Sequence, residues 1–181
     1  MAEPVRKLLL LVPVVPALVV LAACGRPVTP KAVAADGGPE PAPSSAARET
    51  LADLDPCALL SPSDRSSAGL TELGKPKTIG PARACDWTVP STFGVTVTLD
   101  ETAGLANLDV SHGTRTNKKV GAHQALQVAD KKAAAGTCAV LLGVGESASV
   151  QVDVSNASFS DTTLACSRAA TVAGLVEPKL P

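Results

Sequence analysis

The fold is decided by the stretch Cys138-Ala139-Val140-Leu141-Leu142-Gly143-Val144, an apolar run that contains no charged residue. A short apolar run between turn signals is typical of a strand buried on both faces. A glycine-containing turn over residues 143–147 follows, and valines then alternate with polar residues at positions 150, 152 and 154. Such alternation predicts a strand with one buried face. Together the two strands predict a hairpin whose first strand lies in the centre of a sheet.

Three more strands are predicted upstream of this hairpin. Residues 84–89 alternate in polarity, with Cys85, Trp87 and Val89 on one face, and residues 95–99 alternate after a turn-rich segment. This pair is expected to form a second hairpin, because β-branched and aromatic residues fill both segments around a short turn. A further strand is expected over residues 122–129.

Helix signals stand at both ends of this region. Asp55-Pro56 and Ser61-Pro62 each place a capping side chain directly before a proline, which is typical of a helix start. They predict a short helical turn over Cys57–Leu60 and a helix from Pro62 to about Ala68, which Gly69 ends. Near the C-terminus, residues 161–176 carry an apolar stripe at helical spacing, with Pro178 as the stop signal. Residues 102–110 are ambiguous and include a short helix in one interpretation.

The order of these elements predicts an α+β domain. Connections of hairpin length favour a mainly antiparallel sheet, of about five strands, with the N-terminal and C-terminal helices packed on it.

The N-terminus predicts export. Arg6 and Lys7 precede an uncharged apolar run over residues 8–20, and small residues follow, which is the pattern of a secretory signal peptide over residues 1–23. The run is shorter than the roughly 20 apolar residues that a membrane-spanning helix needs. Leu21-Ala22-Ala23-Cys24 resembles the bacterial lipobox, which implies diacylglycerol on the Cys24 thiol and a membrane-anchored, extracytoplasmic protein. An ordinary secreted protein is the alternative.

A tether and one domain are expected after Cys24. Residues 24–50 are rich in proline, alanine and glycine and have no periodicity, so they cannot bury enough apolar surface to fold. Residues 51–181 are long enough for a single domain with its own core. This segment contains 11 Lys and Arg and 13 Asp and Glu, and it has no tyrosine. The weak charge and the scarcity of aromatic faces argue against nucleic acid as a partner.

Four cysteines remain in the predicted domain, namely Cys57, Cys85, Cys138 and Cys166. An even number in an exported domain predicts disulfides, and four cysteines can pair in three ways. We favour Cys57–Cys85 and Cys138–Cys166, because both pairs are 28 positions apart and each would link a helix to a strand. A zinc site is the rival interpretation. The absence of any Cys-x-x-Cys spacing disfavours it, and no metal or cofactor is expected.

Three segments carry a family resemblance: Asp55-Pro56-Cys57-Ala58-Leu59-Leu60-Ser61-Pro62, then Ala84-Cys85-Asp86-Trp87, then Cys166-Ser167-Arg168-Ala169 through Val172-Ala173 to Leu180-Pro181. Together they resemble the landmarks of an actinobacterial lipoprotein family, domain of unknown function 3558. Residues 101–119 match none of these landmarks. The resemblance implies export and a lipid anchor but no particular activity and, by analogy, a PsbP-like α/β/α sandwich.

Few residues suggest chemistry. Ser111 and His112, with Asp109 nearby, have the types needed for nucleophilic catalysis, but no Gly-x-Ser-x-Gly elbow exists and exposed loop residues are the favoured interpretation. The Gly-x-Gly-x-x-Ala pattern over residues 143–148 precedes a strand rather than a helix, so it predicts a hairpin turn and not a dinucleotide site. Lys118-Lys119 and Lys131-Lys132 are cation pairs that could meet anionic lipid, although solvated loops are the commoner explanation.

Three functions therefore stay open. The favoured one is a non-catalytic binding module at the outer face of the cell membrane, with a hydrophobic ligand or an envelope protein as partner and an apolar pocket between sheet and helices. The first alternative is an envelope enzyme that uses Ser111 and His112. The second is a purely structural interaction protein.

Overall fold

The computed structural model describes residues 50–130 and 135–181. The predicted signal peptide, Cys24, the tether before Thr50 and the pair Lys131-Lys132 lie outside the described residues.

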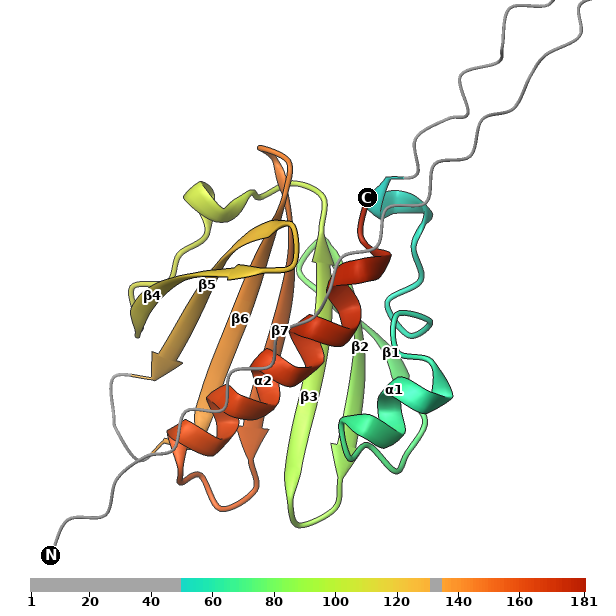
Figure 1. Cartoon of the computed structure of the whole chain (residues 1–181), viewed down its shortest axis with the longest axis vertical. Helices are drawn as coiled ribbons and strands as arrows, with labels where there is room; N and C mark the ends of the chain where they lie inside the picture. Colours follow the sequence, from blue (N-terminus) through green and yellow to red (C-terminus); the bar gives the residue numbers. More distant parts are fainter. Residues whose placement is uncertain (1–49, 131–134) are drawn as a thin grey trace, which may run out of the picture. The chain divides into compact units, whose positions relative to one another are not determined.

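A seven-stranded antiparallel sheet forms the body of the domain (Figure 1). The strands lie in the spatial order β1-β2-β3-β7-β6-β5-β4. Their bounds are β1 Lys75–Ile79, β2 Ala82–Val89, β3 Phe93–Asp100, β4 Gly113–Val120, β5 His123–Asp130, β6 Thr137–Val144 and β7 Ala148–Asn156. The predicted hairpins are therefore confirmed as β2–β3 and β6–β7, and antiparallel pairing joins them through β3 and β7.

The prediction of about five strands was too low, because it missed both edge strands. All five residues of β1 are exposed, and the six central residues of β4 are exposed too. Neither segment has the apolar alternation that reveals a half-buried strand. Proline and lysine in β1, and arginine and lysine in β4, are the residues that proteins use to keep an exposed sheet edge from pairing with another chain.

The core lies between the sheet and helix α2, Thr162–Val176, which crosses one face of the sheet (Figure 1). The prediction of a helix over residues 161–176 is confirmed, and the side chain of Asp161 caps it by accepting the Leu164 N–H at 2.9 Å. The buried side of α2 consists of Ala165, Cys166, Ala169, Val172, Ala173 and Val176. The sheet meets it with buried alternate residues of four strands, among them Trp87, Val97, Val140 and Val152.

The expected N-terminal helix does not pack on the sheet as predicted. Helix α1, Pro62–Ser67, starts at the predicted Ser61 cap but has six residues, none of them buried. Its sequence is polar on every side, so it has no apolar face to bury. The N-terminal contribution to the core comes instead from irregular segments around it, through Leu51, Leu59, Leu60 and Leu70.

Three short 3-10 helices complete the described chain: η1 Leu51–Asp53, η2 Leu105–Asn107 and η3 Glu177–Lys179. The ambiguous segment 102–110 thus holds one turn of helix, η2, within a loop between β3 and β4. The strand predicted to be central, β6, lies beside the middle strand β7. The predicted burial of this strand on both faces is seen at Leu141, which is 1% exposed on the face opposite α2.

Candidate binding pocket

The face of the sheet opposite α2, which we call the open face, holds a pocket of about 350 Å³. Strand register places its lining residues in two rows that run across the sheet. One row is Asp86, Thr96, Asp153, Ala139 and Val128, on β2, β3, β7, β6 and β5. The second row is Gly94, Ser155, Thr137, Asp130 and Gly113. His112 adds to the lining from the loop before β4. We call this hollow the central pocket.

Small side chains keep the central pocket open. At Gly94 an added Cβ would meet only the Trp87 carbonyl oxygen, at 3.7 Å, so the space in front of this strand residue is empty. Gly94 pairs with Ser155, and Ala139 lies two strands further along the sheet. Elsewhere the loop between β3 and β4 covers the open face. Ser149 Oγ donates to the Ala103 carbonyl there at 2.7 Å, and Val110 is 8% exposed.

Two of the aspartates in the central pocket differ in their surroundings. Asp86 accepts a hydrogen bond from Thr96 Oγ1 at 2.6 Å and forms an ion pair with Lys77 Nζ at 3.5 Å. Asp153 accepts only the amide nitrogen of Gln151, at 2.8 and 2.9 Å. Burial raises the pKa of the Asp153 carboxyl, and the Gln151 hydrogen bonds and the more distant charge of Lys77 oppose this only in part.

The charge of the lining is one-sided. It includes three aspartates, and neither lysine nor arginine is among the lining residues that the structure describes. Asp130 accepts from Thr137 Oγ1 at 3.4 Å. Val128 and Ala139 supply apolar surface between the acids. A pocket with apolar walls and a few convergent polar groups is the usual form of a small-molecule site.

The two residues proposed for catalysis, Ser111 and His112, lie next to each other in the loop before β4. Ser111 donates its backbone N–H to Asp109 Oδ1 at 3.0 Å, and this bond and the Ser111 hydroxyl lower the pKa of Asp109. His112 lies at the central pocket, but among residues 50–130 and 135–181 no hydrogen bond joins its ring to a carboxylate. A triad needs such a bond to orient the base.

Both favoured disulfides are present. Cys57 and Cys85 have Cα atoms 5.1 Å apart, and Cys138 and Cys166 have Cα atoms 4.9 Å apart. Cys138 on β6 and Cys166 on α2 form the expected helix-to-strand link. The other link needs a correction: residues 56–60 form a turn before α1 rather than a helix, so Cys57 ties a turn to β2.

Two further expectations concern charge and metals. The pair Lys118-Lys119 lies on the edge strand β4 rather than in a loop. Within the described ranges, no group of three or more His, Cys, Asp or Glu side chains is placed to hold a metal ion, and no helix is long and apolar enough to cross a membrane.

The pocket expected between the sheet and the helices lies elsewhere. No residue of α2 lines the central pocket, which opens on the other side of the sheet. Asp153 occupies a polar position of the alternating strand β7, and Gly94 is the second residue of β3, so neither stands out in its own strand. Register is what brings them together, because it sets which residues of separate strands share a face.

The fold and the site define the class of protein, an antiparallel α+β domain with two disulfides, one covering helix and a pocket on the uncovered face. A family model described as "Protein of unknown function (DUF3558)" matches residues 19–179, so the chain belongs to this family. No curated protein and no solved structure matches the chain. The α/β/α sandwich implied by resemblance is not seen in the described residues, where the open face carries a loop and one turn of 3-10 helix.

Proposed function

We propose that this chain is an extracytoplasmic lipoprotein, anchored in the cell membrane through lipid on Cys24, whose domain binds an envelope ligand without catalysis. The central pocket is the binding site. The observation that carries this proposal is the pocket itself, which has a volume of about 350 Å³. It lies where residues with small side chains, such as Gly94, leave space on the open face of the sheet. A site of this size suits a small ligand or one group of a larger one.

The anchor rests on the N-terminal sequence. The cationic start, the apolar run and Leu21-Ala22-Ala23-Cys24 follow one another in the order that lipoprotein export requires. The family match begins at residue 19 and therefore includes this tetrapeptide together with the folded domain. Two acyl chains on Cys24 would hold the protein stably at the membrane, whereas a single chain would hold it only marginally.

The anchor is tested by expressing the full chain in an actinobacterial host with a radioactive or alkyne-tagged fatty acid. The wild-type chain is expected to incorporate the label and to partition into the detergent phase. Cys24→Ser is expected to lose the label and appear in the aqueous phase, while the double variant Cys57→Ala with Cys85→Ala keeps the label. Label on the Cys24→Ser chain would show that the anchor lies elsewhere.

Binding is tested on the mature lipidated chain, exposed to an envelope extract and then examined by native mass spectrometry. A discrete added mass is expected on the wild-type chain. Gly94→Val is expected to lose that mass, because its side chain projects into the central pocket where nothing but one carbonyl lies within contact distance. Thr88→Val is the matched control, since Thr88 pairs with Gly94 on the same face but is exposed and does not line the pocket. An added mass that survives Gly94→Val would place binding outside this pocket.

A further inference from the structure

The carboxyl group of Asp153 lies in the middle of the open face, and within residues 50–130 and 135–181 the cation that acts on it, Lys77, is too distant to form an ion pair with it. Its strand, β7, is the fourth of seven, and its cross-strand neighbours Thr96 and Ala139 have small side chains. Throughout the described part of the chain, no lysine, arginine or histidine nitrogen forms an ion pair with Asp153. Asp86, on the same row, has Lys77 at 3.5 Å. The two acids are therefore not equivalent, and among the described residues Asp153 is the one without an ion pair.

A half-buried carboxylate is unfavourable unless a charge or several donors compensate it. Gln151 supplies one amide nitrogen to both oxygens of Asp153. An ionised carboxyl offers about four lone-pair sites, so acceptor capacity remains. Since Asp153 lines the central pocket, that remaining capacity is available to a ligand.

The distribution of charge on the open face selects the sign of the ligand. Acids lie in the middle of this face and line the central pocket, whereas Lys77 and Arg115 lie on the outer strands β1 and β4. An anionic ligand in the pocket would meet three aspartates, and a cationic one would meet the acid that has no ion pair among the described residues. Complementary charge of this kind determines which ligands a site accepts.

The walls beside Asp153 add a second requirement. Ala139 pairs with Asp153, and Val128 pairs with Ala139, so apolar surface extends from the carboxyl group toward β5. On the other side Thr96 Oγ1 donates to Asp86 and keeps lone pairs that can accept a hydrogen bond. The site therefore offers acceptors at one end and an aliphatic contact at the other.

We infer that the central pocket takes a primary ammonium group on a short aliphatic stem, with the ammonium group on Asp153 and the stem against Ala139 and Val128. This inference rests on the proposed function, because it takes the central pocket to be the binding site. An ammonium group has three N–H donors and no acceptor, which fits a lining where carboxylate and hydroxyl oxygens converge. The charge-assisted hydrogen bonds to Asp153 are the strong ones of the set.

The test uses the mature lipidated chain in detergent micelles and ligand-observed NMR titrations with three probes of similar size: n-butylammonium, n-butanol and pentanoate. We expect n-butylammonium to bind at least about tenfold more tightly than n-butanol, because only the cation forms charge-assisted bonds. Pentanoate is expected not to bind. Asp153→Asn keeps the shape of the side chain and should bring n-butylammonium to within about twofold of n-butanol. Glu72→Gln removes one exposed charge outside the pocket and should change nothing.

The outcomes separate this inference from the proposed function. If n-butanol or pentanoate binds as tightly as n-butylammonium, or if no probe binds, the ammonium assignment is wrong. The pocket itself is tested separately, by the loss of the envelope-derived mass in Gly94→Val. If Gly94→Val still binds n-butylammonium more tightly than the other probes, the preference comes from the detergent micelle and not from the pocket. That result would overturn the assignment. Given a positive result, putrescine and Nα-acetyl-lysine methylamide distinguish a free amine from a lysine side chain as the source of the group.

Discussion

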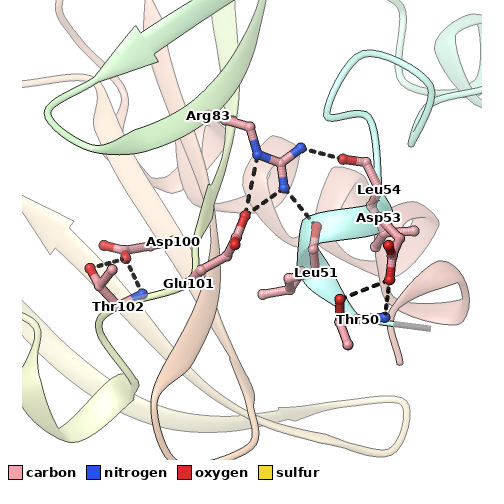
Figure 2. A network of polar contacts seen from close by, with 8 residues as sticks. All are labelled: Thr50, Leu51, Asp53, Leu54, Arg83, Asp100, Glu101 and Thr102. Atoms are coloured by element: carbon pink, nitrogen blue, oxygen red, sulfur yellow. Dashed lines mark hydrogen bonds and ion pairs between the residues drawn. The ribbon is translucent and has the colours of Figure 1, made fainter. Parts of the chain in front are cut away.

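Nη2 of Arg83 lies 2.6 Å from Glu101 Oε1, and the two terminal nitrogens of the same guanidinium group face the chain that follows the predicted tether (Figure 2). The group donates to the carbonyl oxygens of Leu51 and Leu54 at 2.7 and 2.5 Å. One side chain at the start of β2 thus binds the end of β3 and the first turn of the domain. In a lipid-anchored protein this turn would be the first folded element to feel tension on the tether.

Arg83→Met should lower the free energy of unfolding by about 1–3 kcal/mol, because it removes donors from two backbone carbonyl groups. The Leu54 amide, which donates to Leu51 at 3.2 Å, should exchange with solvent faster in the variant. Glu101→Gln should cost less than about 1 kcal/mol, since both partners of this ion pair are more than a third exposed. Urea unfolding and hydrogen exchange measure both effects. Equal losses in the two variants would mean that the ion pair, and not the carbonyl contacts, stabilises this turn.

A second contact between distant segments predicts pH dependence. Lys179 in η3 donates to Asp64 Oδ2 at 2.5 Å, and together with the Ser61 hydroxyl it lowers the pKa of Asp64 to about 2. A carboxyl group with a lowered pKa in the folded state stabilises the fold above its ordinary value of 3.8, and the stabilisation is lost as the pH falls toward 2.

Asp64→Asn should therefore be less stable than wild type by about 1 kcal/mol at neutral pH, a figure that allows for solvent screening of a partly exposed pair. The difference should shrink as the pH falls from 4 to 2, as followed by urea unfolding. Lys179→Met is the companion variant, because it leaves Asp64 hydrogen-bonded to the Ser61 cap of α1 but removes its cation. A difference that stays constant down to pH 2 would show that the charge of Asp64 contributes nothing.

The elements that could be predicted from the sequence are those with one buried face, because burial of one face spaces the apolar residues periodically. The strands around Trp87, Val97, Val140 and Val152 and the helix that begins after Asp161 were all visible, because one face of each packs into the core. The edge strands β1 and β4 were missed for the opposite reason, since exposure on both faces removes the period. The turn at Cys57 was predicted to be helical because an aspartate cap followed by proline can begin either a helix or an isolated turn.

The candidate site was harder to predict for a geometric reason. Its lining comes from six strands and a loop. Only the register across β2, β3, β7, β6 and β5 brings Asp86, Asp153 and Val128 to one level. No local pattern encodes that alignment. His112 was singled out by residue type, and it does lie at the central pocket.

The two disulfides allow a comparison at equal loop length. Both close loops with a sequence separation of 28, so the chain-entropy account gives each about 3–4 kcal/mol of stabilisation. Replacing either pair by alanines should lower the free energy of unfolding by that order. Any further difference then reports packing in the native state.

Fluorescence distinguishes the two pairs. Trp87 is the single tryptophan and is 1% exposed. Its ring and the sulfur of Cys85 both lie against Gly74. Loss of Cys57–Cys85 should free the turn over Trp87 and shift its native emission to longer wavelength. Loss of Cys138–Cys166, at the start of α2, should leave the native emission unchanged while lowering stability. Identical shifts in both double variants would mean that the core loosens as one unit.

The last prediction concerns the cost of keeping an acid in the central pocket. Burial raises the pKa of Asp153, so the folded state disfavours its charged form. A carboxyl group with a raised pKa destabilises the fold above that pKa, and the penalty fades as the pH falls to the ordinary value of 3.8. Asp153→Asn keeps the size of the side chain and its contact with Gln151. It should therefore be more stable than wild type at neutral pH, by about 0.5–2 kcal/mol.

The gain should shrink as the pH falls toward the ordinary value of 3.8 and be small at pH 3.5, where the wild-type carboxyl group is mostly protonated in both states. Chemical unfolding monitored by Trp87 fluorescence at pH 7 and pH 3.5 measures it, with Glu72→Gln as the exposed-charge control. A substitution that stabilises the fold and abolishes ammonium binding would indicate that Asp153 is kept for binding, because residues at functional sites often reduce stability. If Asp153→Asn is instead destabilising at pH 7, the acid has a structural role, and its lack of an ion pair among the described residues no longer argues for a ligand.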